Sequence, residues 1–359
     1  MLLLWKILGD FVKPGDIRAQ ESFECCFSEV CWVLGPQELK TSLPRFHLNI
    51  FNISFSPQHI FPSASRDHEQ PLTPPVSQIK YKTLSGELVA ILMIAEVVSN
   101  SMLSLPSSLA VVGVIPGLTL IIFLGVFATY TSYLLVQSKL RHQEVHNTGD
   151  DGLVLFGPFG RELLASSTIV FAVFATGGQP LAGQIALGAL SDSKLCLVLY
   201  TGIFAIPTLL CSFSRTLGRL SWLSIPSVLS ILVAGIAGMI STCVHPMPGR
   251  ELSAAKSSNF YVAFVSITKP IFAYAEHFMF FILVSEMRRP QDAIKAAYTL
   301  QGFATTFYAV FAVVVYVYAG DSVASPAFSS LERKWMKAAY GITILNFRIS
   351  GSLYAHTAS

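Results

Sequence analysis

Long apolar segments separated by short polar ones dominate this chain from about residue 88 onward. The longest stretch without a charged residue covers positions 97–138, or 42 residues. A helix needs about 20 apolar residues to cross the hydrocarbon core of a bilayer, so this stretch predicts two spans rather than one. The same reasoning predicts seven full transmembrane helices and the beginning of an eighth, over residues 88–110, 116–136, 163–191, 195–214, 220–244, 260–284, 296–320 and 338 onward. A polar loop is expected over residues 137–162.

The first predicted span is interrupted by polar residues. It carries the carboxylate of Glu96, then the polar run Ser99–Ser101, and then the helix-breaking Pro106. A charge inside a membrane helix costs at least about 2.5 kcal/mol on insertion scales. Backbone that leaves helical geometry at this depth is tolerated only where it faces protein or a water-filled cavity. We therefore predict a broken helix that lines a site near the middle of the membrane.

The sixth predicted span, residues 260–284, is interrupted as well. The pairs Lys269–Pro270 and Glu276–His277 stand in an otherwise apolar context. Each residue also has an ordinary structural interpretation. The lysine could reach the outer headgroups, Glu276 could pair with it seven positions away, and His277 could be a hydrogen-bonded interior histidine. Two interrupted spans at matching positions of two halves are nevertheless the best sequence indication of a transporter site.

The chemistry of these two interruptions suits a proton-coupled carrier. A carboxyl group held in the membrane takes up and releases a proton near neutral pH when its surroundings disfavour the charged form. Glu96, Glu276 and His277 are therefore the candidate proton-coupling residues. Backbone N–H groups at the start of a half-helix can hold the carboxylate of a substrate.

Composition and charge support a membrane protein with its N-terminus in the cytoplasm. The chain is 52% hydrophobic and 13% charged, whereas soluble domains are about 25% charged. Its net charge of +3 gives no indication of a nucleic-acid partner. Residues 1–80 differ in kind from the rest and are expected to form a largely irregular tail. With that tail inside, the inner loops hold ten Lys and Arg residues and the outer loops hold six, and this excess predicts the orientation.

Four segments carry a more specific pattern. They are Met93–Glu96 with Leu103–Pro106, Phe156–Glu162, Phe272–Ala275 with His277, Ser285–Glu286 and Pro290, and Ala339–Gly341. In this order they resemble the first helix, the segment before the third helix, the sixth helix with its following loop, and the start of the eighth helix of the amino acid/auxin permease family, in its fungal form. The resemblance covers about residues 80–355.

This resemblance implies an all-α integral membrane protein with the broken-helix, inverted-repeat fold of the amino acid–polyamine–organocation (LeuT-like) transporters. It divides the chain into the tail at residues 1–80, a first repeat at 81–245 and an incomplete second repeat at 246–359. It also implies proton-coupled transport of neutral amino acids across the plasma membrane or the vacuolar membrane. The lipid bilayer and the amino acid are then the partners, and the proton gradient is the driving force. No cofactor, metal or nucleic acid is expected, and the oligomeric state is left open.

The resemblance places the substrate contacts at the breaks of spans one and six. The residues concerned are Ser99, Asn100, Ser101, Met102, Phe272, Ala273, Tyr274 and Ala275.

Departures from the family pattern leave an alternative open. Asn100–Ser101 and Glu276 stand where the family usually has glycine, and glycine would free backbone groups for the substrate. The sequence ends within the predicted eighth helix, so the second repeat is expected to be truncated. A non-transporting membrane sensor or an inactive truncated paralogue is therefore the second candidate.

Two other classes of protein receive little support. His142 and His146 form an H-x-x-x-H pair that could chelate a metal on a helix. Membrane desaturases and hydroxylases use several such boxes, however, and a solvated loop explains a single one. The chain has no H-E-x-x-H and no G-x-S-x-G motif, so we do not expect an enzyme. A channel would need a polar stripe along several helices, and spans two, four and seven show none.

Overall fold

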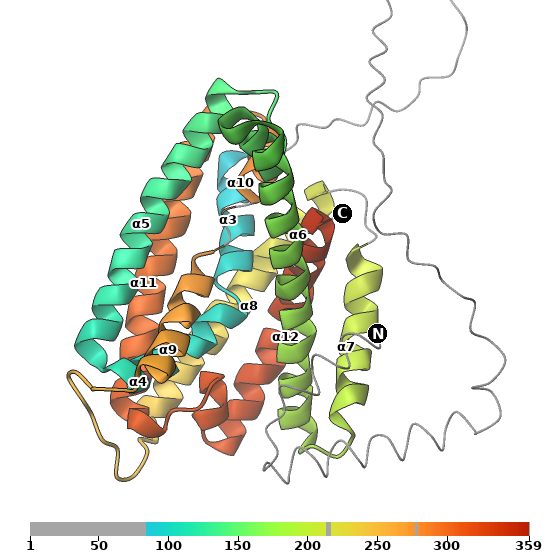
Figure 1. Cartoon of the computed structure of the whole chain (residues 1–359). Helices are drawn as coiled ribbons and strands as arrows, with labels where there is room; N and C mark the ends of the chain where they lie inside the picture. Colours follow the sequence, from blue (N-terminus) through green and yellow to red (C-terminus); the bar gives the residue numbers. More distant parts are fainter. Residues whose placement is uncertain (1–83, 213–216, 276, 278, 359) are drawn as a thin grey trace, which may run out of the picture. The chain divides into compact units, whose positions relative to one another are not determined.

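The computed structural model of this chain describes residues 84–212, 217–275, 277 and 279–358. The predicted tail, residues 1–80, and the proton-coupling candidate Glu276 lie outside the described residues. The described chain is helical throughout (Figure 1). Its elements are α3 (Gly86–Val97), η2 (Asn100–Ser104), α4 (Leu105–Val112), α5 (Val114–Arg141), α6 (Thr148–Ser191), α7 (Leu197–Ser212), α8 (Leu217–Val244), α9 (Phe260–Ala273), α10 (Met279–Ser285), η4 (Pro290–Asp292), α11 (Ala293–Ala319), η5 (Gly320–Ser322), η6 (Ala327–Ser330) and α12 (Arg333–Ala358).

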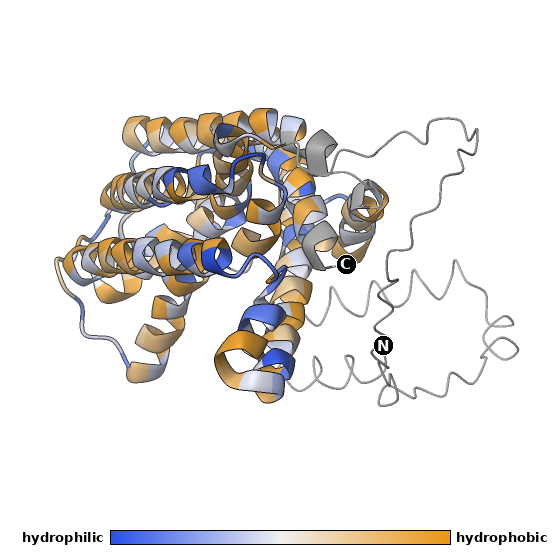
Figure 2. Cartoon of the chain, turned by 90° about the horizontal axis from the view of Figure 1, so that it is seen from above, coloured by the Kyte–Doolittle hydropathy of each residue, from blue (hydrophilic) through white to orange (hydrophobic). Residues whose placement is uncertain are grey.

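Several described helices have the length and apolar character that a membrane requires. Figure 2 shows hydrophobic residues along the helices and hydrophilic residues mainly near their ends and in the connections. Apolar helices shorter than 18 residues cover Leu197–Leu210 and Phe260–Ala273. The five segments long enough to cross are Gly86–Val112, Val114–Arg141, Thr148–Ser191, Trp222–Val244 and Pro290–Ser322. These findings agree with an all-helical protein that crosses the membrane several times, whereas the number of spans stays a prediction.

The expected polar loop at residues 137–162 is shorter than predicted. Helix α5 continues to Arg141, and α6 begins directly after Asn147. The side-chain oxygen of Asn147 accepts a hydrogen bond from the backbone N–H of Asp150 at 2.8 Å, which caps the new helix. Gly157, with φ of 70°, then separates this short first helix from the long apolar part of α6.

Helix α3 lies among other helices, whereas α5 lies at the edge of the bundle (Figure 1). Helix α3 contacts α8, α11 and α12, and α5 packs mainly against α11. In an apolar stretch of 18 residues within Gly86–Val112, 72% of the residues are buried. In the corresponding stretch of α5 only 22% are buried. The side chains of Phe123 and Phe127 on α5 are exposed. The interrupted first span is therefore surrounded by protein, where non-helical backbone is tolerated.

A backbone pairing joins the segment before α3 to the segment after α10. The N–H of Leu84 donates to the carbonyl of Glu286 at 3.3 Å, and the N–H of Arg288 donates to the carbonyl of Leu84 at 2.9 Å. Both Leu84 and Met287, which form this bridge, are buried. The neighbouring carboxyl of Glu286 is partly shielded from water as well, and this burial raises its pKa. The start of α3 and the end of α10 are thus tied together.

Helices α5 and α11 approach closely at a glycine. A Cβ atom added at Gly125 of α5 would lie 2.2 Å from Thr305 Oγ1 on α11. We expect Gly125→Ala to lower the free energy of unfolding by about 1–3 kcal/mol, because the added methyl group forces the two helices apart. The measurement is thermal unfolding of the purified protein in detergent. Gly302→Ala on α11 is the control, since nothing lies within 4 Å of its added Cβ. Equal unfolding temperatures for both variants would contradict the close packing.

Candidate functional site

The first span is broken between α3 and α4. Helix α3 ends at Val97, and Ser99 takes non-helical angles (φ −119°, ψ −125°) before the 3₁₀ turn η2. Helix α4 then begins with Pro106 in its first turn, where a missing N–H costs nothing because the first N–H groups of a helix lack partners. The polar run and the proline thus separate the two half-helices at the position that the sequence indicates.

The sixth span is broken at one place rather than two. Pro270 lies inside α9, which continues to Ala273, so the predicted interruption at Lys269–Pro270 is wrong. Proline leaves the carbonyl of Ser266, four residues earlier, without its helical donor. The hydroxyl of Ser108 on α4 donates to that carbonyl at 3.0 Å, and this substitute bond allows the helix to continue.

Lys269 points toward α4. Its Nζ donates to the hydroxyl of Ser107 at 2.7 Å, and the side chain is partly buried. Neither reaching the outer headgroups nor pairing with Glu276 is needed to explain this contact. The second break follows α9 at Tyr274 and Ala275, and α10 resumes at Met279.

Side chains from distant helices satisfy the carbonyls at the end of α3. The last four carbonyls of a helix have no helical donor and need other partners. The carbonyl of Ile94 accepts from the backbone N–H of Val98 at 2.9 Å. The carbonyls of Ala95, Glu96 and Val97 accept from Asn346 Nδ2 (3.0 Å), the hydroxyl of Tyr354 (3.4 Å) and the hydroxyl of Tyr308 (2.6 Å), respectively. The break is thus held by α11 and α12.

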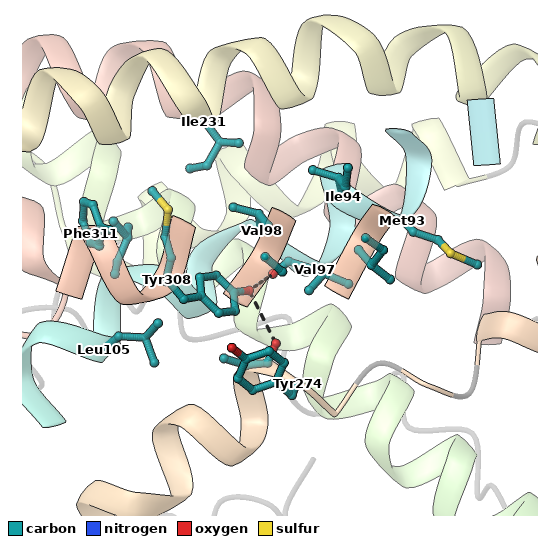
Figure 3. Packing of buried hydrophobic residues seen from close by; sticks show 14 of the residues in the cluster. Met93, Ile94, Val97, Val98, Leu105, Ile231, Tyr274, Tyr308 and Phe311 are labelled. Carbon is teal, nitrogen blue, oxygen red and sulfur yellow. Dashed lines mark hydrogen bonds between the residues drawn. The ribbon is translucent and has the colours of Figure 1, made fainter. Parts of the chain in front are cut away.

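Tyr308 of α11 lies where the two breaks meet. Figure 3 shows its hydroxyl between the end of α3 and the segment that carries Tyr274. The hydroxyl donates to the carbonyl of Val97 and lies 3.4 Å from the carbonyl of Ala273, the last residue of α9. Ser101 Oγ lies 3.2 Å away and also donates to Val97. The Tyr274 and Tyr308 rings meet edge to face, with centroids 5.4 Å apart.

Asn346 of α12 connects three helices behind the first break. Its Oδ1 accepts from the hydroxyl of Ser99 at 2.7 Å. Its Nδ2 donates to the carbonyl of Ala95 and to the hydroxyl of Ser227 on α8, at 3.0 and 2.9 Å. Asn346, Ser99 and Ser227 are all at most 1% exposed. This polar cluster fixes α3, α8 and α12 relative to one another.

Two proton-coupling candidates line one small cavity. Its volume is about 10 Å³, room for about one water molecule. Glu96, which is 1% exposed, lines it together with His277, Tyr274 and Gln301. Gln301 of α11 donates through Nε2 to the hydroxyl of Ser132 at 3.2 Å. Among the described residues its Oε1 has no hydrogen-bond partner, so an acceptor is available beside the carboxyl group.

His277 is held against α5. Its Nε2 lies 3.0 Å from the carbonyl oxygen of Ala128 and 3.0 Å from Thr131 Oγ1. A carbonyl oxygen only accepts, so the contact with Ala128 requires a proton on Nε2. His277 is therefore a hydrogen-bonded interior histidine, and it also faces the small cavity.

A larger cavity of about 680 Å³ lies further along the same two helices. Ile94 of α3 and Ala296 of α11 line it, about one turn from Val97 and Leu300 at the small cavity. No predicted substrate-binding residue is among its lining. Its charged lining residues are Glu87, Arg288, Arg289, Asp292 and Lys295, at helix ends and in a connection on the side that the charge pattern predicts to be cytoplasmic.

Not every predicted site residue faces the meeting point of the breaks. Ser101, Ala273 and Tyr274 surround Tyr308, and Ser99 joins the Asn346 cluster. Met102 is buried next to Gly235 of α8. Phe272 is 45% exposed, with its ring 5.5 Å from that of Phe171 on α6. Asn100 and Ala275 are partly buried.

The histidine pair after α5 does not lie on a helix. Helix α5 ends at Arg141, and His142 and His146 follow in the connection to α6. His142 Nδ1 lies 3.2 Å from Glu144 Oε1. The one-turn spacing that would bring both imidazoles to a metal is therefore lost.

Comparison with known proteins points to one family. The family model described as "Transmembrane amino acid transporter protein" matches residues 83–358. The N amino acid transport system protein of Neurospora crassa is 28% identical over 290 residues, which are 76% of this chain and 60% of that protein. A transmembrane transporter of Gibberella moniliformis is 29% identical over 293 residues, 79% of this chain and 62% of that protein.

A third relative is more distant. Vacuolar amino acid transporter 4 of Saccharomyces cerevisiae is 26% identical over 168 residues, 44% of this chain and 23% of that protein. The chain spans about three fifths of the length of the first two curated relatives.

Proposed function

This chain belongs to the family of transmembrane amino acid transporter proteins, and from that membership we propose that it is a secondary active carrier of neutral amino acids driven by a proton gradient. The substrate binds between the breaks of spans one and six. The two spans that carry these breaks are the first spans of two inverted repeats of the LeuT-like kind. The first span of the second repeat includes α9. The carrier works in the plasma membrane or the vacuolar membrane, with its N-terminus in the cytoplasm.

The observation that carries this proposal is the meeting of two helix ends at Tyr308. The carbonyls of Val97 and Ala273 end α3 and α9, and both lie within 3.4 Å of one hydroxyl oxygen. The C-terminal end of a helix carries partial negative charge, which favours a cation. The ammonium group of an amino acid is such a cation. The start of α4, across the first break, carries the opposite partial charge and suits the carboxylate.

The lining of the small cavity supports a neutral side chain. Met93, Val97, Met279, Phe280 and Leu300 contribute apolar surface. Glu96 is the acidic residue of this lining, and no lysine or arginine is among the described lining residues, so an acidic side chain would find no counter-charge there.

Proton coupling rests on Glu96 and His277. Both line the cavity that has room for about one water molecule, and Gln301 offers an acceptor there. The Glu96 carboxyl is 1% exposed and thus shielded from water, so a substrate that brings its own charges acts on it strongly.

Binding and uptake by the purified full chain test this proposal. We expect radiolabelled neutral amino acids to bind the detergent-solubilised protein, and glutamate to bind at least about tenfold more weakly, because burying an unpaired charge costs several kcal/mol. In proteoliposomes, uptake should increase when the outside is made acidic. Binding without uptake would favour the sensor, and absence of both would favour the inactive paralogue.

A further inference from the structure

The hydroxyl of Tyr308 lies where the proposed ammonium group would bind. It donates to the carbonyl of Val97 at 2.6 Å and lies 3.4 Å from that of Ala273. Its side chain is fully buried, and its ring packs edge to face on Tyr274. The hydroxyl therefore occupies, from a third helix, the point at which α3 and α9 end.

One phenol hydroxyl cannot satisfy both helix ends at once. A tyrosine has a single O–H donor, whereas an ammonium group has three N–H donors in a compact cation. The short contact with Val97 takes the tyrosine hydrogen, and the contact with Ala273 is correspondingly long. A substrate ammonium group could serve both carbonyls, and charge-assisted bonds of this kind are stronger than neutral ones.

We propose that Tyr308 is a positioning residue whose hydroxyl takes the place of the substrate ammonium group in the empty carrier and gives it up when substrate binds. This inference rests on the proposed function. In the empty state the hydroxyl holds the ends of α3 and α9 together across the breaks. On binding, the ammonium group takes the carbonyls of Val97 and Ala273. The tyrosine hydroxyl then turns to Ser101 Oγ, which is already 3.2 Å away.

The consequence is a competition between Tyr308 and the substrate for the same acceptors. Tyr308→Phe removes only the hydroxyl and keeps the ring that packs on Tyr274. We expect the Kd for a neutral amino acid to fall about fivefold in this variant, the equilibrium equivalent of one ordinary hydrogen bond that the substrate no longer displaces. The empty variant should unfold at a lower temperature than the unchanged protein. Saturating substrate should raise the unfolding temperature of the variant by more than it raises the unfolding temperature of the unchanged protein.

Tyr316→Phe is the matched control on the same helix. Tyr316 is fully buried like Tyr308, but its hydroxyl donates to Asp321 Oδ1 at 2.7 Å and accepts from the N–H of Ser253. Its loss should lower the unfolding temperature equally with and without substrate, and should leave Kd unchanged.

The outcomes separate this inference from the proposed function. If the unchanged protein binds substrate and Tyr308→Phe leaves Kd equal or raises it, the competition is refuted while the carrier function stands. If the variant folds only when purified with saturating substrate, the inference is supported, because the ammonium group replaces the lost donor. If substrate does not restore folding, the inference is refuted. If the unchanged protein binds no neutral amino acid, the proposed function fails and the inference fails with it.

Discussion

Replacing Glu96 with glutamine should remove the pH dependence of uptake. Glutamine keeps the shape of the side chain but cannot take up a proton. Glu96 lies in the last turn of α3, is 1% exposed and lines the small cavity with His277. In the unchanged protein we expect uptake into proteoliposomes to be about tenfold faster at an outside pH of 5 than at pH 7, since the protonated fraction of one group changes up to about tenfold per pH unit. In Glu96→Gln the two rates should be equal.

Glu87→Gln is the control for this substitution. Glu87 lies on the same helix, but in the first turn, and is exposed. The Glu87→Gln variant should keep the full pH dependence of uptake. If Glu96→Gln also keeps it while the unchanged protein shows it, Glu96 does not carry the proton. His277→Gln then becomes the variant to measure, because His277 is the other described titratable candidate at the cavity.

Replacing Asn346 with leucine should cost the protein about 3 kcal/mol of stability. Leucine has the same branching at its γ-carbon, is somewhat bulkier, and offers no polar atom. The substitution would leave the hydroxyl of Ser99, the carbonyl of Ala95 and the hydroxyl of Ser227 without the bonds that Asn346 makes. An ordinary hydrogen bond contributes about 1 kcal/mol, and a buried polar group without a partner costs about 1–3 kcal/mol. Thermal or denaturant unfolding in detergent measures the loss.

Thr343→Val is the control that distinguishes loss of the Asn346 cluster from loss of any buried polar group. Thr343 is also on α12 and fully buried, but its hydroxyl donates within the helix, to the carbonyl of Ala339 at 2.7 Å. We expect a loss below about 1 kcal/mol for this variant, because no other helix loses a partner. Equal losses for both variants would mean that the contacts between α3, α8 and α12 add no stability of their own.

The sequence could predict the break of the first span, because Ser99–Ser101 and Pro106 disturb an otherwise apolar pattern, and a break of the sixth span near Glu276–His277. It could also predict the family from four short segments. It could not predict that α9 continues through Pro270, since the hydroxyl that replaces the missing donor comes from Ser108, 158 positions from its acceptor Ser266.

The residues that hold the breaks could not be predicted for a related reason. Tyr308 is one of four tyrosines in a span without charges, and nothing in the apolar pattern distinguishes it from the others. Asn346 and Gln301 are likewise single amides within helical segments. Their importance depends on which carbonyls and hydroxyls they meet across the bundle. A pattern along one helix does not contain that information.

The pairing of Leu84 with Met287 has a mechanical consequence. Two backbone hydrogen bonds join the residue before the start of α3 to the residues after the end of α10. Moving one end without the other would break both bonds, at about 1 kcal/mol each. We therefore expect the two ends to move together, and the cavity of about 680 Å³, which both α3 and the segment after α10 line, to change shape with both at once.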